Sequence, residues 1–576
     1  MLKVIEIENI KGISHKRFEL DIEPNKPSLL VAPNGFGKSS FAAAFTSMNN
    51  RRIVLKEDDF HEEDNTKLPR IYIEYKRPDD TIVNLEATST TNTISSEIDC
   101  FVINNPIKAK GIGGLYGRAT AELEIKDVVL VDRIPTNISF GYQYRIAQQR
   151  FGVNAKVLPN AILALNNSKV VEKLSRNYQA LLRANGSRIQ TRINNIINDI
   201  NLQNGTEDQL TNWITTNKLN DLKQIDYLNV IGNLIHEFDL GFGSETKSYL
   251  VAIQLINIFN NNQNRFKEAC EHSNYLLYKQ RFDATLLTFN CTWKGIRSSQ
   301  TGGQLVVKFP KAIHISNGQR DILTFISMLF RAKRHLLKDS NILIIDEIFD
   351  YLDDANLTAA QYYITTFIKE FNDEDKRLYP IILTHLNPNY FKNYAFSKQK
   401  VYYLDKSTIR VNSNLERLLR NREQPTIKDE VSKHLFHYEP SLINKRAEFR
   451  ALRLPETWGE SNNFHNFLLT EVENYLNDRP FCPFAVCGGL RVRIEEIAYN
   501  KLTTPASQTI FLATKRTRNK LEKAEELGII SPESHYLLGI IYNEGMHWKE
   551  GFDNISPIAS KLENIIIKKL IRDVFN

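Results

Sequence analysis

The sequence feature that most constrains the fold is a short apolar segment that runs directly into a glycine-bearing loop. Residues 27–32 (PSLLVA) predict a buried strand, residues 33–40 (PNGFGKSS) the loop, and residues 41–45 (FAAAF) the start of a helix. A phosphate-binding loop requires this order, because the backbone N–H groups of the loop and the helix N-terminus both attract an anion. Ala32 stands where the general pattern has its first glycine. We therefore expect a site for a nucleoside triphosphate here.

The loop predicts which groups contact the nucleotide. Lys38 is expected to reach the β- and γ-phosphates, and the hydroxyl of Ser39 to bind Mg²⁺. ATP and Mg²⁺ are thus the expected cofactors. The residues expected around the nucleotide are Asn34, Gly35, Phe36, Gly37, Lys38, Ser39 and Ser40.

A second group of motifs follows about three hundred residues later. Residues 341–347 (NILIIDE) form a continuous apolar strand that ends in Asp346 and Glu347. In a phosphate-loop protein the first acid holds the Mg²⁺ and the second polarises the attacking water. Another apolar strand, residues 380–383, ends at Thr384 and His385. The order and spacing of these pieces indicate a single ATP-hydrolysing site.

These motifs resemble the ABC-type ATPase heads of the SMC, RecF and RecN group. The resemblance is carried by the opening strand with Asn9 and Lys11, by the loop at 33–40 and by the acid pair. It covers about half of the chain, roughly residues 1–150 and 285–415. It implies an α/β fold, in which a P-loop NTPase head is split by a helical insertion.

The resemblance also implies roles for residues outside the loop. Ser316, Gly318 and Gln319 match the signature motif, with Asn317 in place of the usual glycine. His385 matches the switch histidine, and residues 350–353 (DYLD) match the D-loop. Asn104, after the strand at 100–103, stands where the family places a metal-binding glutamine.

The family mechanism implies that the active species is a pair of heads. The signature of one copy contacts the γ-phosphate that the other copy binds, so ATP holds the two heads together. Glu347 would then orient the attacking water, and His385 would sense the γ-phosphate. A second copy of the chain is therefore an expected partner.

We expect four parts along the chain. These are the N-terminal half of the head (1–150), a helical insertion (151–285), the C-terminal half of the head (286–420) and a mainly α domain (421–576). The insertion lacks sustained heptads and a Cys-x-x-Cys hook, so a long-armed chromosome tether is disfavoured. A helical sensor or docking module is the favoured interpretation of the insertion.

The C-terminal domain carries two pairs of polar residues at helical spacing. Arg491 and Glu495 lie four residues apart, as do Asn543 and His547, and each pair therefore shares one helix face. If the two helices pack together, this set suits metal-independent RNA cleavage. His547 would move a proton, Arg491 would stabilise charge on the phosphorus, and Glu495 would orient one of them.

This arrangement resembles HEPN-type ribonuclease domains, and the layout resembles the PrrC and RloC anticodon nucleases. HEPN proteins usually carry Arg just before the Asn, where this chain has Tyr542. The basic run at 515–520 would seat RNA phosphates, or it is a solvated helix face. The structural alternative for the four polar residues is a surface Arg–Glu pair with a core or capping histidine.

Composition, charge and hydropathy limit the partners and the cellular location that we expect for the protein. The chain has 576 residues and a net charge of +7, which permits a nucleic-acid partner without requiring one. No apolar run approaches the roughly 18 residues needed to cross a bilayer, and the N-terminus does not read as a secretory signal. We expect a cytoplasmic protein with no membrane partner.

Two hypotheses of different classes follow. In the first, the protein is an ATP-gated effector of bacterial anti-phage defence whose own C-terminal domain cuts RNA, with tRNA as the expected target. In the second, it is a regulatory ATPase that binds a separately encoded nuclease, as Septu- and retron-associated ATPases do. A RecF-like role in DNA repair is less favoured, because it would not need the C-terminal domain.

Overall fold

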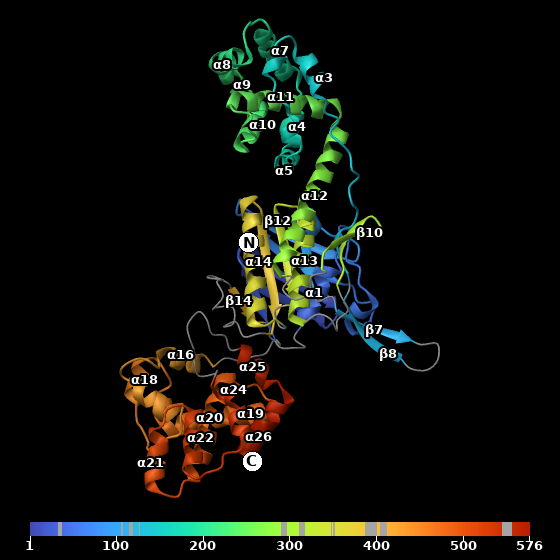
Figure 1. The fold of residues 1–576 in the computed structure, drawn as a ribbon. Helices are drawn as coiled ribbons and strands as arrows, with labels where there is room; N and C mark the ends of the chain where they lie inside the picture. The colour runs from blue at the N-terminus through green and yellow to red at the C-terminus, as the bar shows by residue number, and fades with distance from the viewer. Residues whose placement is uncertain are drawn as a thin grey trace. The chain divides into compact units, whose positions relative to one another are not determined.

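The computed structural model describes residues 1–32, 37–104, 107–113, 119–125, 127–289, 296–309, 317–346, 348, 352–385, 400–403, 412–543 and 556–576. The structure is mixed α/β, with one parallel sheet and many helices (Figure 1). Two compact units divide the chain: Met1–Asn105 together with His335–Asn576, and Pro106–Arg334. In the part of the chain that is described, no helix is long and apolar enough to cross a membrane.

A five-stranded sheet joins strands from the N-terminal residues with strands from residues 340–403. Its strand order is β14-β3-β13-β12-β6, and every neighbouring pair is parallel. The continuous apolar runs of the two strands β12 and β13 fit a sheet whose faces are both covered. The strands are β3 (Ser28–Val31), β6 (Ile98–Ile103), β12 (Ser340–Asp346), β13 (Arg377–Thr384) and β14 (Lys400–Tyr403).

A second, antiparallel sheet packs with the first through helix α1 (Lys38–Thr46). Its order is β2-β1-β4-β5. Phe41 and Phe45 of α1 share one core with apolar side chains of both sheets, including Ile5 of β1 and Ile342 of β12. The helix that follows the phosphate loop is thereby fixed on two sides. The strands are β1 (Leu2–Ile10), β2 (Ile13–Ile22), β4 (Arg70–Lys76) and β5 (Ile82–Thr88).

One short helix, α2 (Ile94–Glu97), and one long helix, α14 (Asp354–Asp373), accompany these two sheets. Asp353 caps α14, because its side chain accepts the N–H of Asn356. Helix α14 contacts β13 and thus covers part of the parallel sheet.

The unit Pro106–Arg334 contains a helical core and small sheets. Tyr249 of α11 packs against Gly232 of α10, and Tyr249 belongs to a buried apolar cluster that extends from Phe151 to Cys270. Asn177 ends α5 and separates it from α6. The helices are α3 (Tyr144–Phe151), α4 (Ile162–Leu165), α5 (Ser168–Arg176), α6 (Tyr178–Arg183), α7 (Ser187–Asn201), α8 (Glu207–Asn217), α9 (Leu219–Lys223), α10 (Asp226–Glu237), α11 (Glu245–Asn261), α12 (Gln263–Phe289) and α13 (Asn317–His335). The strands are β7 (Ile107–Gly113), β8 (Ala119–Ile125), β9 (Val128–Val131), β10 (Ser298–Thr301) and β11 (Gln304–Val307).

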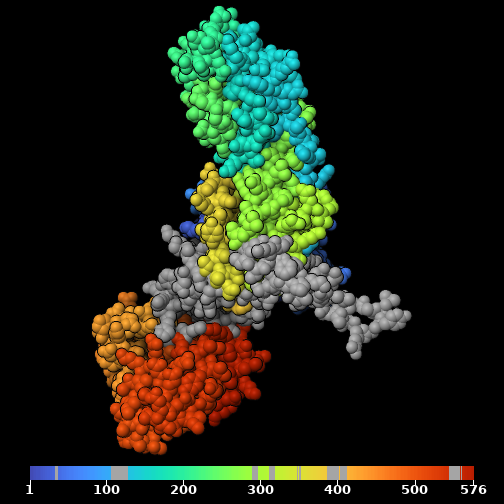
Figure 2. Space-filling model, viewed as in Figure 1, coloured from blue at the N-terminus to red at the C-terminus, as the bar shows by residue number. Residues whose placement is uncertain are grey.

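The C-terminal residues form a helical bundle with its own core, drawn in orange to red in Figures 1 and 2. Helix α20 lies at its centre: 12 of its 18 residues are buried, and it contacts α19, α22, α24, α25 and α26. This helix begins at Pro483, whose fixed φ suits a first turn. The helices are α16 (Ser413–Asn421), α17 (Lys428–Glu430), α18 (Arg446–Ala451), α19 (Ser461–Leu476), α20 (Pro483–Asn500), α21 (Pro505–Ala513), α22 (Thr517–Glu526), α23 (Glu533–Leu537), α24 (Gly539–Tyr542), α25 (Ser556–Leu562) and α26 (Ile565–Phe575).

Close contact between α19 and α20 depends on a glycine, which gives a first prediction. A Cβ on Gly489 would lie 2.9 Å from Cγ2 of Val472 and 3.2 Å from the carbonyl oxygen of Leu468. We expect Gly489→Ala to destabilise the bundle by about 1–3 kcal/mol, measured as faster hydrogen exchange in α19 and α20. Gly539→Ala is the control, because its Cβ would meet no atom closer than 3.4 Å. Equal exchange in the two variants would contradict the packing argument.

Candidate functional site

The end of the phosphate loop lies where helix α1 begins. Gly37 has a φ of 92°, a left-handed conformation that favours glycine, and its carbonyl oxygen accepts the N–H of Phe41 at 2.9 Å. Lys38 is 3% exposed, and its Nζ donates to the carbonyl oxygen of Ala32 at 2.7 Å. The lysine therefore bridges the two ends of the loop. Asn34, Gly35 and Phe36 lie outside the described residues.

The two serines after Lys38 have different environments. Ser40 is buried, and its Oγ accepts the N–H of Gly12 at 3.1 Å, which ties α1 to the turn after β1. Ser39 is exposed. Its hydroxyl is thus the one of the pair that faces solvent and is available to a metal or a phosphate.

The parallel register brings several predicted residues to one edge of the sheet. Thr384 pairs with Val31, and Asp346 pairs with Leu383. Ala32, His385 and Asp346 therefore all lie at the carboxyl ends of adjacent strands, the edge at which open α/β sheets bind ligands. Asp346 is two strands from the phosphate-loop strand, about 10 Å at the usual strand spacing.

The groups on this edge have the chemistry that a Mg–nucleotide needs. A serine hydroxyl (Ser39) and a carboxylate (Asp346) are the hard oxygen ligands that suit Mg²⁺. Asn104 follows β6 at the same edge and is exposed, as is His385. Glu347, the expected water-orienting acid, lies outside the described residues.

The predicted signature residues lie at the start of helix α13. Gly318 and Gln319 are half-buried in its first turn, in the unit Pro106–Arg334. Arg320 and Asp321 follow as a buried ion pair, with Nε of Arg320 2.8 Å from Oδ1 of Asp321. Ser316 lies outside the described residues.

Two of the four polar residues predicted in the C-terminal domain line a single cavity. The cavity has a volume of about 1080 Å³, and Arg491 and Asn543 are among its lining residues. Glu495 is fully buried beside it, and His547 lies outside the described residues. The structure thus brings Arg491, Glu495 and Asn543 into one region of the bundle.

Glu495 binds several groups, but Arg491 is not among its hydrogen-bond partners. Its Oε1 accepts hydrogen bonds from Nδ1 of His437 at 2.6 Å and from the hydroxyl of Thr517 at 2.6 Å. Its Oε2 accepts from Nζ of Lys520 at 2.8 Å and from the N–H of Tyr438 at 3.1 Å. Burial alone would raise the pKa of Glu495, but the charges and hydrogen bonds of His437 and Lys520 prevail and lower it to about 2. Glu495 is therefore ionised at neutral pH.

Arg491 is held by the backbone at the end of α24 and not by Glu495. It is 7% exposed, and its Nη2 donates to the carbonyl oxygen of Tyr542 at 2.5 Å. Its Nε is buried and has no hydrogen-bond partner among the described residues. Burial lowers the pKa of this guanidinium. A buried cation with an unsatisfied donor is a site that favours an anion.

The basic run at 515–520 does not form a uniform solvated face. Lys515, Arg516 and Arg518 are exposed. Thr517 and Lys520 are buried, and both donate hydrogen bonds to the Glu495 carboxylate. All of these residues line the cavity. Sequence reasoning identified the run but not His437, which lies in an irregular segment where no periodicity marks an inward-facing side chain.

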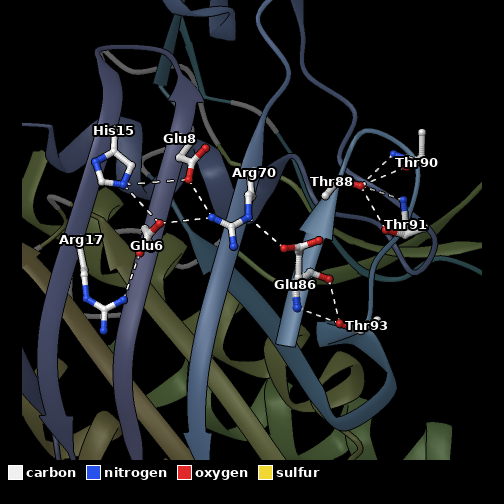
Figure 3. Close-up of polar contacts among 10 residues, drawn as sticks. All are labelled: Glu6, Glu8, His15, Arg17, Arg70, Glu86, Thr88, Thr90, Thr91 and Thr93. Atoms are coloured by element: carbon white, nitrogen blue, oxygen red, sulfur yellow. Dashed lines mark hydrogen bonds and ion pairs between the residues drawn. The ribbon is translucent and has the colours of Figure 1, made fainter. Parts of the chain in front are cut away.

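A third polar cluster lies on the antiparallel sheet and is shown in Figure 3. Glu6, Glu8 and His15 place ligand-type atoms within 4.8 Å of one another. Arg70 donates to both glutamates, at 3.2 Å and 2.8 Å, and Arg17 donates to Glu6 at 3.1 Å. The arginines neutralise the carboxylates, so the cluster is a cross-strand ion-pair network.

Comparisons with known proteins give only remote matches. Neither a protein-family model nor a curated protein matches the sequence. Among solved structures, an Smc head bound to the C-winged helix domain of ScpA is 12% identical, with 68% of this chain and 92% of that chain covered and a TM-score of 0.26. The recombination mediator RecF-ATPrS of the RecFOR pathway is 13% identical, with coverages of 70% and 96% and a TM-score of 0.26. An Smc head with a coiled coil and joint from Pyrococcus yayanosii is 12% identical, with coverages of 68% and 93% and a TM-score of 0.27.

Identities and TM-scores this low carry no argument about fold or function. The candidate site is characterised by the strand order and by the side chains at the carboxyl edge of the sheet.

The buried Glu495 predicts a pH dependence of stability. Its pKa in the folded chain, about 2, lies below the ordinary 4.5. Its contribution to stability is therefore present above pH 4.5 and lost as the pH falls toward 2. We expect Glu495→Gln to destabilise the bundle at pH 7 and the difference from wild type to shrink between pH 4.5 and 2, measured by urea unfolding. A difference that stays constant over this range would contradict an ionised Glu495.

Proposed function

We propose that the protein is an ATP-hydrolysing ABC-type ATPase of the SMC and RecF kind. The observation that carries this proposal is the shared edge of the parallel sheet. The loop that contains Lys38, the carboxylate of Asp346 and the imidazole of His385 all follow strands that end there. A triphosphate with Mg²⁺ at this edge would lie close to the ammonium group of Lys38, to the carboxylate of Asp346 as a metal ligand and to the imidazole of His385.

Side chains of this chain would act on ATP in distinct ways. Lys38, now bonded to the carbonyl oxygen of Ala32, would turn to the β- and γ-phosphates, because a charged phosphate oxygen is the stronger acceptor. Ser39 and Asp346 would hold the Mg²⁺, which neutralises charge on the phosphates. Glu347 would orient the water, and His385 would contact the γ-phosphate.

We also propose that two copies close around ATP. Gly318 and Gln319 begin helix α13, and a helix N-terminus favours a phosphate. In a head pair, this end of one copy would bind the γ-phosphate held by the other. ATP would then join the two copies, and its hydrolysis would release them.

The dimer is tested by a variant that binds ATP without hydrolysing it. We expect Glu347→Gln to lower ATP turnover by at least about 100-fold and to accumulate a dimer with ATP, measured by light scattering. Lys38→Ala is the control and should stay monomeric, because it lacks the cation that holds the phosphates. A Glu347→Gln protein that binds ATP and remains monomeric would disprove the paired-head mechanism.

For the biological role, we propose an anti-phage defence ATPase that controls a nuclease, with its own C-terminal domain as the RNA-cutting part. The specific support is the basic cavity that contains Arg491 and Asn543. The second candidate is a regulatory subunit that docks a separately encoded nuclease, with the bundle as the docking domain. A RecF-like repair ATPase remains the third.

Toxicity in a bacterial host separates the first two roles. If the C-terminal domain cuts RNA with His547 as its proton-transfer residue, expression of the wild type alone should arrest growth, and His547→Ala should restore it. The control is His236→Ala, an exposed histidine of α10, which should remain toxic. Growth unaffected by the wild type would favour the regulatory subunit and count against the self-contained effector.

A further inference from the structure

The C-terminal cavity has the charge of a polyanion site. Of its lining residues that the structure describes, eight are Lys or Arg and three are Asp or Glu. Two of the acids are already paired, Glu423 with Lys428 at 3.1 Å and Glu439 with Lys433 at 3.3 Å. Lys515 and Arg516 have no acidic partner in the described part of the chain. This surplus favours phosphate groups, as on a nucleic-acid strand.

The size of the cavity fits a short stretch of strand. Its volume of about 1080 Å³ is at the upper end of the roughly 300–1,000 Å³ of small-molecule sites. The half-buried Tyr438 lines it beside the cations, and aromatic rings are platforms on which exposed bases stack. A single-stranded segment is therefore the ligand that the cavity suits best.

Arg491 is the group in this cavity that is built to hold one phosphate. The carbonyl oxygen of Tyr542 fixes one end of the guanidinium, so its direction is set before a ligand arrives. The buried Nε has no partner, and Glu495, four residues away, is occupied by other groups. A phosphate in the cavity would offset the charge of this buried guanidinium.

His437 lines the same cavity and is oriented by Glu495. Nδ1 of His437 lies 2.6 Å from the Glu495 carboxylate, and the side chain is 19% exposed. An ionised carboxylate requires Nδ1 to carry the proton, which leaves Nε2 of the neutral ring as a proton acceptor. A carboxylate in this position also stabilises the imidazolium that forms when Nε2 is protonated. Lys520 and Thr517 hold the carboxylate in place.

We propose that His437 is the proton-transfer residue of an RNA-cleaving centre in this cavity, with Arg491 as the ligand of the scissile phosphate. Nε2 of His437 takes the proton of a ribose 2′-hydroxyl while the 2′-oxygen bonds to phosphorus. The bond between phosphorus and the 5′-oxygen breaks, and the leaving oxygen takes a proton from water in the open cavity. The products are a 2′,3′-cyclic phosphate and a 5′-hydroxyl end. The inference rests on the proposed RNA-cutting role of this domain and gives His437, which the sequence did not suggest, the proton transfer that the sequence assigned to His547.

The test uses the full chain with total cellular RNA as the probe, with and without ATP. We expect the wild type to produce 2′,3′-cyclic phosphate ends and His437→Gln to cut at least about 100-fold more slowly. Imidazole added to His437→Ala should restore part of the rate, which a merely structural histidine would not show. His535→Gln is the matched control, a buried histidine of the same bundle outside the cavity, and should cut like the wild type.

Three results would overturn the proposal: cutting by His437→Gln at the wild-type rate, 5′-phosphate products, or no cutting of total RNA by the wild type in either condition. ATP hydrolysis measured on the same samples keeps the two proposals apart. A protein that hydrolyses ATP without cutting RNA refutes the centre and leaves the ATPase standing. If His437→Gln has a lower melting temperature than the wild type, the imidazole rescue of His437→Ala decides whether His437 transfers the proton.

Discussion

The candidate site at the edge of the parallel sheet depends on the register of three adjacent strands. Because β13 lies between β3 and β12 with no bulge, the ends of all three strands fall at the same level. The loop, Thr384 with His385, and Asp346 are remote in sequence, and this alignment alone brings them within reach of one ligand. A slip of one residue in either pairing would turn the alternate side chains to the opposite face.

The register is itself protected by the core. Phe41 and Phe45 of α1 pack between the parallel and antiparallel sheets, so the helix cannot shift without opening both layers. The hydrogen bond from Gly12 to Ser40 adds a polar tie at the same place. The position of Lys38 is thus set by apolar packing beneath it.

Much of the head could be predicted from the sequence, because its signals are local. The segment PSLLVA becomes β3 and NILIIDE becomes β12, since continuous apolar runs before a glycine loop or an acid pair suit strands buried on both faces. Asp346 and His385 follow directly from the strand ends. The order of strands in the sheet is not local, and no spacing in the sequence indicated it.

In the C-terminal site, the contacts between segments that are remote in sequence could not be predicted. The spacing of Arg491 and Glu495 correctly indicated one helix face, but not that Glu495 would bind His437 and Lys520 in place of Arg491. Those contacts join positions 437, 495 and 520 across three segments, and the short irregular stretch around His437 has no period.

The Glu495 carboxylate joins separate pieces of chain, since it accepts from Thr517 and Lys520 of α22 and from His437 and Tyr438 of the segment before α18. Moving α22 away would leave the charged Glu495 carboxylate in the apolar interior without its donors Thr517 and Lys520, which is strongly disfavoured. Glu495 thereby links the position of α22 to that of the His437 imidazole.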